Sequence, residues 1–213
     1  MRLETILKCV AASKCNVLAD IGTDHAFIPI EAIKRKLASK AIACDISPGP
    51  LEIGKKNVVK EGLAEYIELR LGDGLRPIRQ SEADVIVIAG MGGLRILGII
   101  SQGLEKIGNA SLILQPQHDT SKLRRGLFEL GIKIQSEHLA REGERFYEIL
   151  CAAKCTEMPL YTEEDFFLGS HTGEFASQFY LQKKQKIEGY IERVTDEKEK
   201  EKAFNELTWL SRI

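Results

Sequence analysis

The sequence predicts an α/β protein with a doubly wound, mostly parallel, Rossmann-like sheet, one reversed strand and a C-terminal α-helical hairpin. Short, continuous apolar runs alternate with amphipathic stretches up to about residue 150, and most runs stop at Gly, Asp or Pro. Continuous apolar runs are typical of strands that are covered on both faces, as in parallel sheets. After Cys155 no strand pattern remains, and only helical spacing follows.

The elements follow one another in a regular order. A leading helix is expected at residues 2–12, packed against the sheet edge. The apolar runs predict strands at residues 17–21, 41–46, 66–71, 85–89 and 112–114. The amphipathic stretches predict helices at residues 27–37, 51–61, 94–107 and 122–130. Successive strand–helix–strand units imply right-handed crossovers and hence a doubly wound sheet.

The pattern changes near residue 132. Apolar stretches at residues 132–139 and 146–153 flank a polar turn at 140–145, which predicts an antiparallel pair. We expect residues 1–155 to form the catalytic domain and residues 156–213 a helical, coiled-coil-like C-terminal domain.

The C-terminal part shows heptad spacing. The apolar seam of the first helix, with one polar member, comprises Ala176, Tyr180, Lys183, Ile187, Tyr190 and Val194. Residues 194–198 offer an N-cap for a second helix, with Ala203, Leu207 and Leu210 on one face. A dimerisation or packing arm and a substrate-gripping arm remain equally open, because heptads report burial and not purpose.

Composition narrows the class of protein. The net charge of −1 excludes a general polyanion binder, so any nucleic-acid site must be a local patch. No apolar run approaches the roughly 20 residues of a membrane-spanning helix, and no secretory signal begins the sequence. We therefore expect a cytoplasmic protein. The five cysteines lack CxxC spacing and the four histidines are scattered, so we expect no metal site.

The end of the first strand is the first candidate ligand site. Asp20 and Gly22 close this strand, and a helix begins soon afterwards. Ligands bind at the carboxyl edge of a doubly wound sheet, where such loops lie. Gly22 lets the backbone approach a ligand closely, and the helix N-terminus offers unpaired N–H donors to a carboxylate.

The next three strands end in similar residues. Asp45, with Ile46 after it, lies some twenty residues beyond the glycine, where an acid can accept hydrogen bonds from ribose hydroxyls. Further strand ends are formed by Gly72, Asp73 and Gly74 and by Ala89, Gly90 and Met91. Turn geometry alone explains any one of these sites, and Asp45 or Ser47 could simply cap a helix. The coincidence at four consecutive strands indicates a nucleoside-type ligand.

The first loop distinguishes between two such ligands. Dinucleotides require G-x-G-x-x-G, whereas the sequence from Gly22 reads G-T-D-H-A-F. The second and third glycines are replaced by Asp24 and Ala26. A carboxylate at Asp24 would repel a pyrophosphate but could pair with an ammonium or a sulfonium. The loop therefore favours S-adenosylmethionine over NAD(P), and methyl transfer over an NAD(P)-linked oxidoreductase.

Five motifs together resemble a known family. They are DIGTDHA at 20–26, DISPGP at 45–50, GDGL at 72–75, AGMGG at 89–93 and LQPQ at 114–117. The chain is similar in these motifs to the bacterial tRNA (adenine-22-N1)-methyltransferases, which are class I S-adenosylmethionine-dependent enzymes. A parallel sheet that ends in a hairpin with one reversed strand is typical of that class. The resemblance implies methyl transfer from S-adenosylmethionine to N1 of adenine 22 in tRNA.

The resemblance also implies roles for single residues. Asp20, Gly22 and His25 would lie on the methionine side, Asp45 at the ribose and Asp73 at the adenine. The cofactor site would also include Thr23, Ile46, Gly72 and Gly74. Ala89, Gly90 and Met91 would border the sulfonium and the incoming base. The fourth motif departs from the (Asp/Asn)-Pro-Pro-Tyr of enzymes that methylate exocyclic amines, so the residue that grips the target base is not evident. Another RNA, a protein or a small molecule as substrate remains an alternative, as does a non-catalytic helical scaffold.

The remaining assignments are hypotheses from residue chemistry. Asp24 is our candidate for stabilising the cationic product base or accepting a proton, with His25 second; a structural hydrogen bond is an equal alternative for His25. For RNA binding we favour Arg141 and Arg145 beside the final turn, followed by Lys34 and Arg35, although most charge clusters are ordinary solvated surface. We expect a monomer or weak dimer.

Overall fold

The computed structural model describes residues 2–213, which form a seven-stranded sheet with the strand order β3-β2-β1-β4-β5-β7-β6. The strands are β1 (Val17–Ile21), β2 (Lys40–Asp45), β3 (Ile67–Leu71), β4 (Val85–Met91), β5 (Ser111–Pro116), β6 (Ile132–Glu142) and β7 (Arg145–Lys154). β7 pairs antiparallel with both β5 and β6, and the other pairings are parallel. The predicted mostly parallel sheet with one reversed strand is confirmed.

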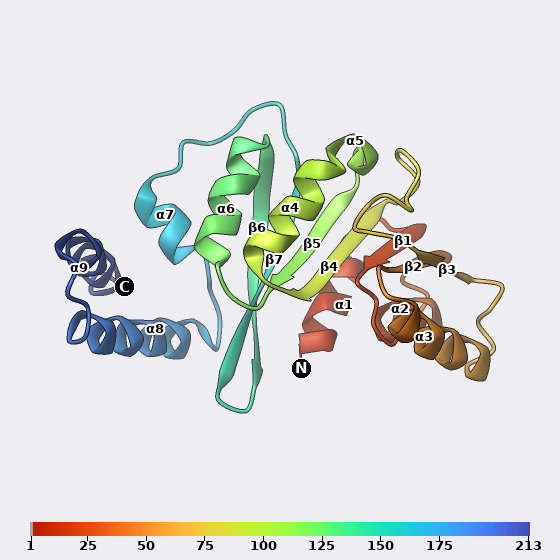
Figure 1. The fold of residues 1–213 in the computed structure, drawn as a ribbon, viewed down its shortest axis with the longest axis horizontal. Helices are drawn as coiled ribbons and strands as arrows, with labels where there is room; N and C mark the ends of the chain where they lie inside the picture. The colour runs from red at the N-terminus through yellow and green to blue at the C-terminus, as the bar shows by residue number, and fades with distance from the viewer. Residues whose placement is uncertain (1) are drawn as a thin grey trace.

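Helices cover both faces of the sheet (Figure 1). They are α1 (Arg2–Ala12), α2 (Phe27–Lys34), α3 (Pro48–Lys60), α4 (Gly93–Gln102), α5 (Leu104–Ile107), α6 (Thr120–Glu129), α7 (Glu163–Leu168), α8 (Ala176–Ile191) and α9 (Glu197–Leu210). α1, α2 and α3 pack on one face, and α4 and α6 on the other. Within residues 2–213, no helix combines the length and apolarity that crossing a bilayer requires.

The apolar runs form strands because both of their faces are covered. In β4, Val85, Ile86, Val87 and Ile88 are all fully buried. Alternate residues of this strand join the two core clusters on opposite faces of the sheet. Burial of each such side chain contributes about 1.5–3 kcal/mol, which explains why a continuous apolar run predicts a central strand.

Several predicted boundaries were wrong. The helix expected at residues 94–107 is two helices, because Gly103 leaves helical geometry with φ −118° and ψ 25°. A Cβ at Gly103 would lie 2.6 Å from Cβ of Leu75, so the chain passes close to its neighbour at this break. The short α7 was not predicted, although the Thr162 side chain and backbone form a capping box with Asp165. The last hairpin has a tighter turn than the six residues we expected.

The predicted C-terminal helical hairpin is present. α9 packs back against α8, and Tyr190 of α8 donates to Glu199 of α9. The N-cap Asp196 accepts a hydrogen bond from the backbone N–H of Glu199 at 2.9 Å, as the sequence suggested. Coiled-coil character is not supported, since α8 and α9 have only 16 and 14 residues and coiled coils sustain three or more heptads. The seam member Tyr190 is 41% exposed. An independent domain at residues 156–213 stays a prediction.

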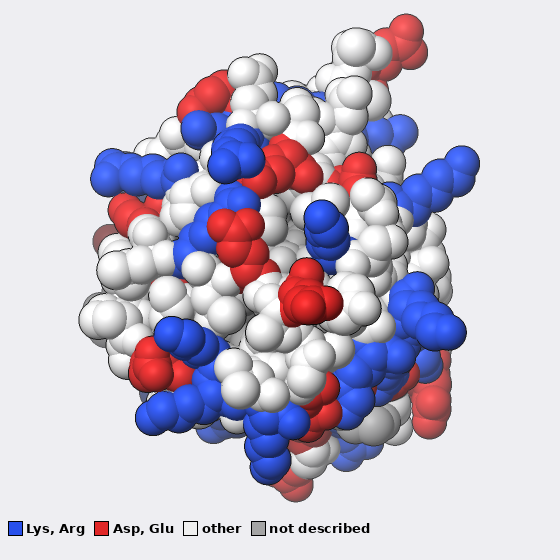
Figure 2. All heavy atoms as spheres, turned by 90° about the vertical axis from the view of Figure 1, so that its right-hand side faces the viewer, with Lys and Arg blue, Asp and Glu red and all other residues white. Residues whose placement is uncertain are grey.

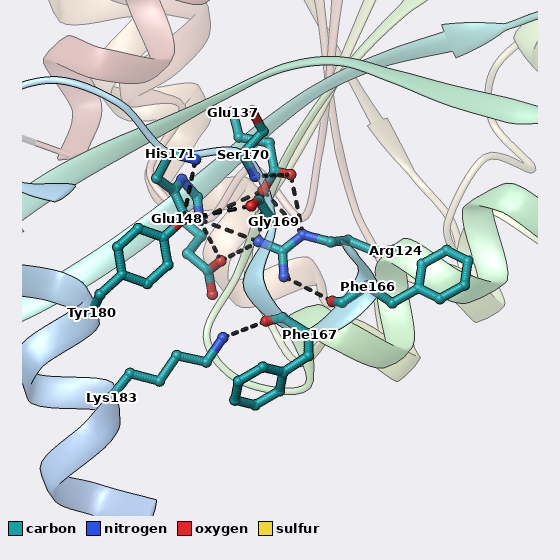
Figure 3. A network of polar contacts seen from close by, with 10 residues as sticks. All are labelled: Arg124, Glu137, Glu148, Phe166, Phe167, Gly169, Ser170, His171, Tyr180 and Lys183. Atoms are coloured by element: carbon teal, nitrogen blue, oxygen red, sulfur yellow. Dashed lines mark hydrogen bonds and ion pairs between the residues drawn. The ribbon is translucent and has the colours of Figure 1, made fainter. Parts of the chain in front are cut away.

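A buried ionic cluster joins this C-terminal segment to the sheet (Figure 3). Arg124 of α6 is 3% exposed and pairs with Glu137 of β6 at 2.6 Å and with Glu148 of β7. The ring of His171 contacts Glu148 at 2.8 Å, and Lys183 of α8 donates to the backbone oxygen of Phe167. Burial lowers the pKa of Lys183 to about 8 although Glu148 opposes the shift.

Breaking this cluster should destabilise the protein. Replacement Arg124→Met leaves two buried carboxylates without their main partner, so the free energy of unfolding should fall by about 3–5 kcal/mol. The adjacent Arg125→Met is the control: its pairing with Glu163 is largely exposed, and its loss should cost less than about 1 kcal/mol. Denaturant unfolding measures both, and equal losses would contradict the assigned role of Arg124.

Candidate active site

The ends of the first four strands meet in one crevice of about 510 Å³, within the roughly 300–1,000 Å³ typical of small-molecule pockets. Every residue that the sequence predicted for the cofactor or for catalysis lines it. They are Asp20, Gly22, Thr23, Asp24, His25, Asp45, Ile46, Gly72, Asp73, Gly74, Ala89, Gly90 and Met91. The structure thus brings these residues together, while their individual roles stay predictions.

The loop after β1 is held by its neighbouring strand. The backbone N–H groups of Gly22 and Thr23 both donate to the carbonyl oxygen of Cys44, at 2.8 and 2.9 Å. Gly22 has φ +76°, and a Cβ there would lie 2.2 Å from Cε of Met91. The position therefore requires glycine for two reasons, backbone conformation and close approach across the crevice.

Asp20 is a buried acid with one strong polar contact. It is 2% exposed and accepts a hydrogen bond from the Thr23 hydroxyl at 2.7 Å. Burial raises the pKa of Asp20 to about 7 despite that hydrogen bond. Among the ion pairs of the described residues, none involves Asp20. A cationic ligand in the crevice would supply the opposite charge and favour the ionised form.

Three side chains stand at the mouth of the crevice. Asp24 has φ +47°, its side chain is 68% exposed, and its carboxylate lies 3.5 Å from Nε2 of His25. The ring of His25 stacks on Phe27, with centroids 5.4 Å apart and an interplanar angle of 19°. Phe27 is 56% exposed although it lines the crevice. An exposed aromatic face beside an acid can receive a planar, electron-poor group.

The end of β4 is fixed by a residue whose role the sequence reasoning missed. Gln115 of β5 is fully buried, and its Oε1 accepts a hydrogen bond from the backbone N–H of Gly90 at 3.2 Å. Its Nε2 donates to the carbonyl oxygen of Pro116 at 2.7 Å. Gln115 therefore sets the backbone where the strand register shifts between Ala89 and Met91. The sequence signal that could have revealed this role is the place of Gln115 in the LQPQ motif, directly after the apolar run at residues 112–114.

In the structure, neither Asp45 nor Ser47 caps α3 through its side chain. Ser47 occupies the N-cap position of α3, but its side chain makes no capping hydrogen bond. Oδ1 of Asp45 accepts from the backbone N–H of Ser47 at 2.8 Å, which closes a turn and not the helix end. This bond orients the carboxylate at the crevice wall, where a ligand hydroxyl could reach it.

The leading helix forms a further wall of the crevice that spacing did not predict. Arg2, Leu3 and Ile6 of α1 line it. The backbone N–H of Arg2 donates to Glu142 at 2.9 Å, and its guanidinium lies over the ring of Tyr147 at 5.2 Å. These contacts tie α1 to the β6–β7 hairpin, so a helix expected only to cover the sheet edge also shapes the site. Other residues that line the crevice but were not predicted from the sequence include Phe27, Ile28, Arg95, Ile99 and Gln117.

The predicted RNA-binding residues fall into two groups. Arg141 and Arg145 lie at the tip of the β6–β7 hairpin, and Arg141 donates to Gln178 of α8 at 2.9 Å. Because β6 runs parallel to β5, this tip projects from the carboxyl edge of the sheet (Figure 1). The crevice lies at the same edge. Lys34 and Arg35 end α2 at the opposite edge.

Lys34 and Arg35 are also engaged in ion pairs. Lys34 pairs with Glu61 at 2.8 Å, and Arg35 with Glu4 at 2.8 Å and Glu31 at 3.0 Å. The face at the β3 edge shows acidic and basic side chains interspersed, with no large area of one sign (Figure 2). The structure does not bring Lys34 and Arg35 to the crevice, and their contact with RNA stays a prediction.

Comparison with known proteins decides the family. The sequence profile of the tRNA (adenine(22)-N(1))-methyltransferase family, TrmK, matches residues 18–212. This chain belongs to that family. The Bacillus subtilis tRNA (adenine(22)-N(1))-methyltransferase is 36% identical over 178 residues, which are 83% of this chain and 74% of the relative. The residues quoted for the resemblance were thus sufficient to identify the family.

Solved structures of relatives in the TrmK family share the fold. The crystal structure of the B. subtilis m1A22 tRNA methyltransferase is 30% identical with a TM-score of 0.85, covering 99% of this chain and 96% of that one. A candidate tRNA (m1A22) methyltransferase of Streptococcus pneumoniae, solved in complex with S-adenosyl-L-methionine, is 33% identical with a TM-score of 0.88. The coverage there is 99% of this chain and 97% of the relative.

The crowding at Gly22 predicts a specific loss of cofactor binding. Gly22→Ala places a methyl group against Met91, which must move into the crevice, so affinity for S-adenosylhomocysteine should fall about tenfold or more. Gly62→Ala is the control, because Gly62 has a similar φ of +70° with open space around its Cβ position. Calorimetry should find the Gly62→Ala affinity within about twofold of the parent; an equal loss in both variants would assign the effect to backbone strain alone.

Proposed function

We propose that this member of the TrmK family transfers a methyl group from S-adenosylmethionine to N1 of adenine 22 in tRNA, using the crevice at the ends of β1 to β4. The observation that carries the proposal is the convergence of the predicted strand-end residues on one acidic crevice in a chain of this family. The S. pneumoniae relative solved with S-adenosylmethionine supports the choice of cofactor.

The residues of the crevice fit this cofactor. Both Asp45 and Asp73 line the crevice; Asp45 would accept hydrogen bonds from ribose hydroxyls and Asp73 from an adenine amino group. The N-terminus of α2 has no side-chain cap and borders the crevice, so its N–H groups can bind a carboxylate. Asp20 supplies the buried negative charge that a cation compensates. When bound, S-adenosylmethionine supplies a methyl group activated by a positively charged sulfur.

The chain needs to position the reactants more than to activate them. The N1 lone pair of adenine is already nucleophilic, and well-oriented partners gain about 7–11 kcal/mol over a bimolecular encounter. Methylated adenine is cationic, so a carboxylate at the crevice mouth stabilises the developing charge or accepts a proton from N6. Asp24 stands at this mouth with a largely exposed side chain. Nε2 of His25 lies 3.5 Å from the Asp24 carboxylate and would orient it, while the His25 ring stacks on Phe27.

Phe27 is the proposed platform for the target base. N1 lies on the Watson–Crick edge, so a paired adenine must leave its helix before it reacts. Base–aromatic stacking contributes about 1–3 kcal/mol, and the exposed face of Phe27 borders the crevice. This assignment explains how the enzyme could grip adenine although no aromatic residue follows β4 in the AGMGG motif.

The surrounding tRNA is proposed to lie along the hairpin tip. Arg141 and Arg145 project from the carboxyl edge of the sheet, and α8 lies beside them through Gln178 and Gln182. Phosphate contacts from these arginines would hold the RNA while one base enters the crevice. A tRNA substrate also supports the expected cytoplasmic location, and we keep the expectation of a monomer or weak dimer.

The substrate is tested with a tRNA transcript that carries adenine at position 22. Radiolabelled methyl groups from S-adenosylmethionine should enter this transcript, and reverse transcription should stop at position 22, because N1-methylation blocks the Watson–Crick edge. A transcript with guanine at position 22 is the matched control and should stay unlabelled. Equal labelling of both transcripts, or labelling only of protein or small molecules, would assign the enzyme to another substrate.

Asp24→Asn removes the charge at the crevice mouth while it keeps the shape. At saturating cofactor and tRNA, kcat should fall about 100-fold, in the range of lost acid–base or charge stabilisation. Single-turnover methyl transfer measures the chemical step directly. A rate within about twofold of the parent would remove Asp24 from this role.

Phe27→Ala removes the stacking face. The ratio kcat/KM for tRNA should fall about 10- to 100-fold, corresponding to about 1–3 kcal/mol of stacking, while affinity for S-adenosylhomocysteine stays nearly unchanged. Phe27→Tyr should restore the ratio. Phe204→Ala is the matched control, since Phe204 is 49% exposed on α9 and lies outside the crevice. Undiminished methyl transfer by Phe27→Ala would refute the platform.

A further inference from the structure

Three side chains with soft donor atoms meet on the α1 side of the sheet, away from the crevice lining. Cys9 lies on α1, His138 on β6 and Cys151 on β7. Their two sulfur atoms and one ring nitrogen all lie within 4.8 Å of one another. Neither cysteine is in a disulfide. The sequence expectation of no metal site rested on scattered spacing, and spacing along the chain does not report contacts between elements that are far apart in it.

The hairpin geometry builds this cluster. The register of β6 against β7 shifts between Ile134 and Ser136, and beyond the shift Ser136 pairs with Cys151. Side chains of paired residues share one face, and residues two apart on a strand do as well, so Ser136, His138 and Cys151 face α1 together. Bulges of this kind often re-aim side chains beside functional sites.

The three side chains differ in their exposure to solvent. Cys9 is 4% exposed, Cys151 is partly buried and His138 is exposed. The Ser136 hydroxyl lies 3.0 Å from Nε2 of His138 and holds the exposed ring beside the strand. Two sheltered sulfurs and one solvent-accessible imidazole leave a further coordination position that water can reach.

We propose that Cys9, His138 and Cys151 bind a thiolate-preferring transition-metal ion of the zinc type, with solvent at the remaining position. Zn–S bonds of about 2.3 Å and Zn–N bonds of about 2.0–2.1 Å place two sulfurs and one nitrogen roughly 3.5–3.8 Å apart around a tetrahedral ion. A separation of at most 4.8 Å therefore needs only modest side-chain rotation, which the exposed His138 can supply. Sulfur and imidazole together select zinc over magnesium or calcium, which prefer oxygen.

The ion would link α1 to the last two strands. α1 also contributes Arg2, Leu3 and Ile6 to the crevice wall, so the link would stabilise one side of the active site. The inference does not depend on the proposed substrate, because metal binding is measured without methyl transfer.

Zinc titration of the full-length, reduced and chelator-treated protein tests the site. Competition against a chromophoric chelator should give one zinc ion per chain, and Co²⁺ should produce sulfur-to-metal charge-transfer bands together with tetrahedral d–d bands. His138→Ala should weaken zinc binding at least about tenfold, and Cys151→Ser should abolish the charge-transfer bands. Cys155→Ser is the control, because Cys155 lies outside the cluster and bonds the carbonyl oxygen of Glu157.

His138→Ala keeps the test decisive if a cysteine variant misfolds, because His138 is exposed and its removal leaves the core intact. Zinc binding unaffected by His138→Ala would overturn the proposal. So would a parent protein that binds no zinc, or one whose intact mass shows a Cys9–Cys151 disulfide under the same reducing conditions.

Discussion

The parallel pairing of β1 between β2 and β4 is the constraint on which the site depends. Parallel strands end at the same edge, so the loops after β1, β2, β3 and β4 must meet there. The pairing continues beyond the strand itself, since Gly22 and Thr23 both donate to the carbonyl oxygen of Cys44. Residues from four separate parts of the chain therefore reach one crevice, because the parallel pairing of the strands alone brings them together.

The acidic residues that line the crevice determine which ligands it can bind. Asp20 is buried with a raised pKa, and the loop offers Asp24 where a dinucleotide site would carry glycine. An acidic crevice with the uncapped N-terminus of α2 at one wall suits a ligand that carries both a cation and a carboxylate. It does not suit a pyrophosphate. In the structure the buried carboxyl of Asp20 thus joins Asp24, the residue whose charge made the sequence favour S-adenosylmethionine over NAD(P).

The C-terminal segment is attached by charge as well as by apolar contact. Arg124, Glu137 and Glu148 are sheltered from water, and such groups are stable only when they are paired and hydrogen-bonded. α7 supplies one further partner, because Arg124 donates to the backbone oxygen of Phe166. Lys183 of α8 in turn donates to the backbone oxygen of Phe167. The segment is therefore held in a defined position beside the hairpin tip, where an RNA substrate would lie.

The sequence by itself determined the sheet and most of the crevice. Continuous apolar runs identify buried strands, and the residues at their ends are local features whose convergence follows from the parallel arrangement alone. Only the tertiary structure decided the wall formed by α1, the role of Gln115, the ionic cluster around Arg124 and the meeting of Cys9, His138 and Cys151. These features depend on contacts between elements far apart in the chain, on a register shift in the last hairpin and on close approaches such as that of Gly103 to Leu75. Such contacts leave no periodic pattern in a single sequence.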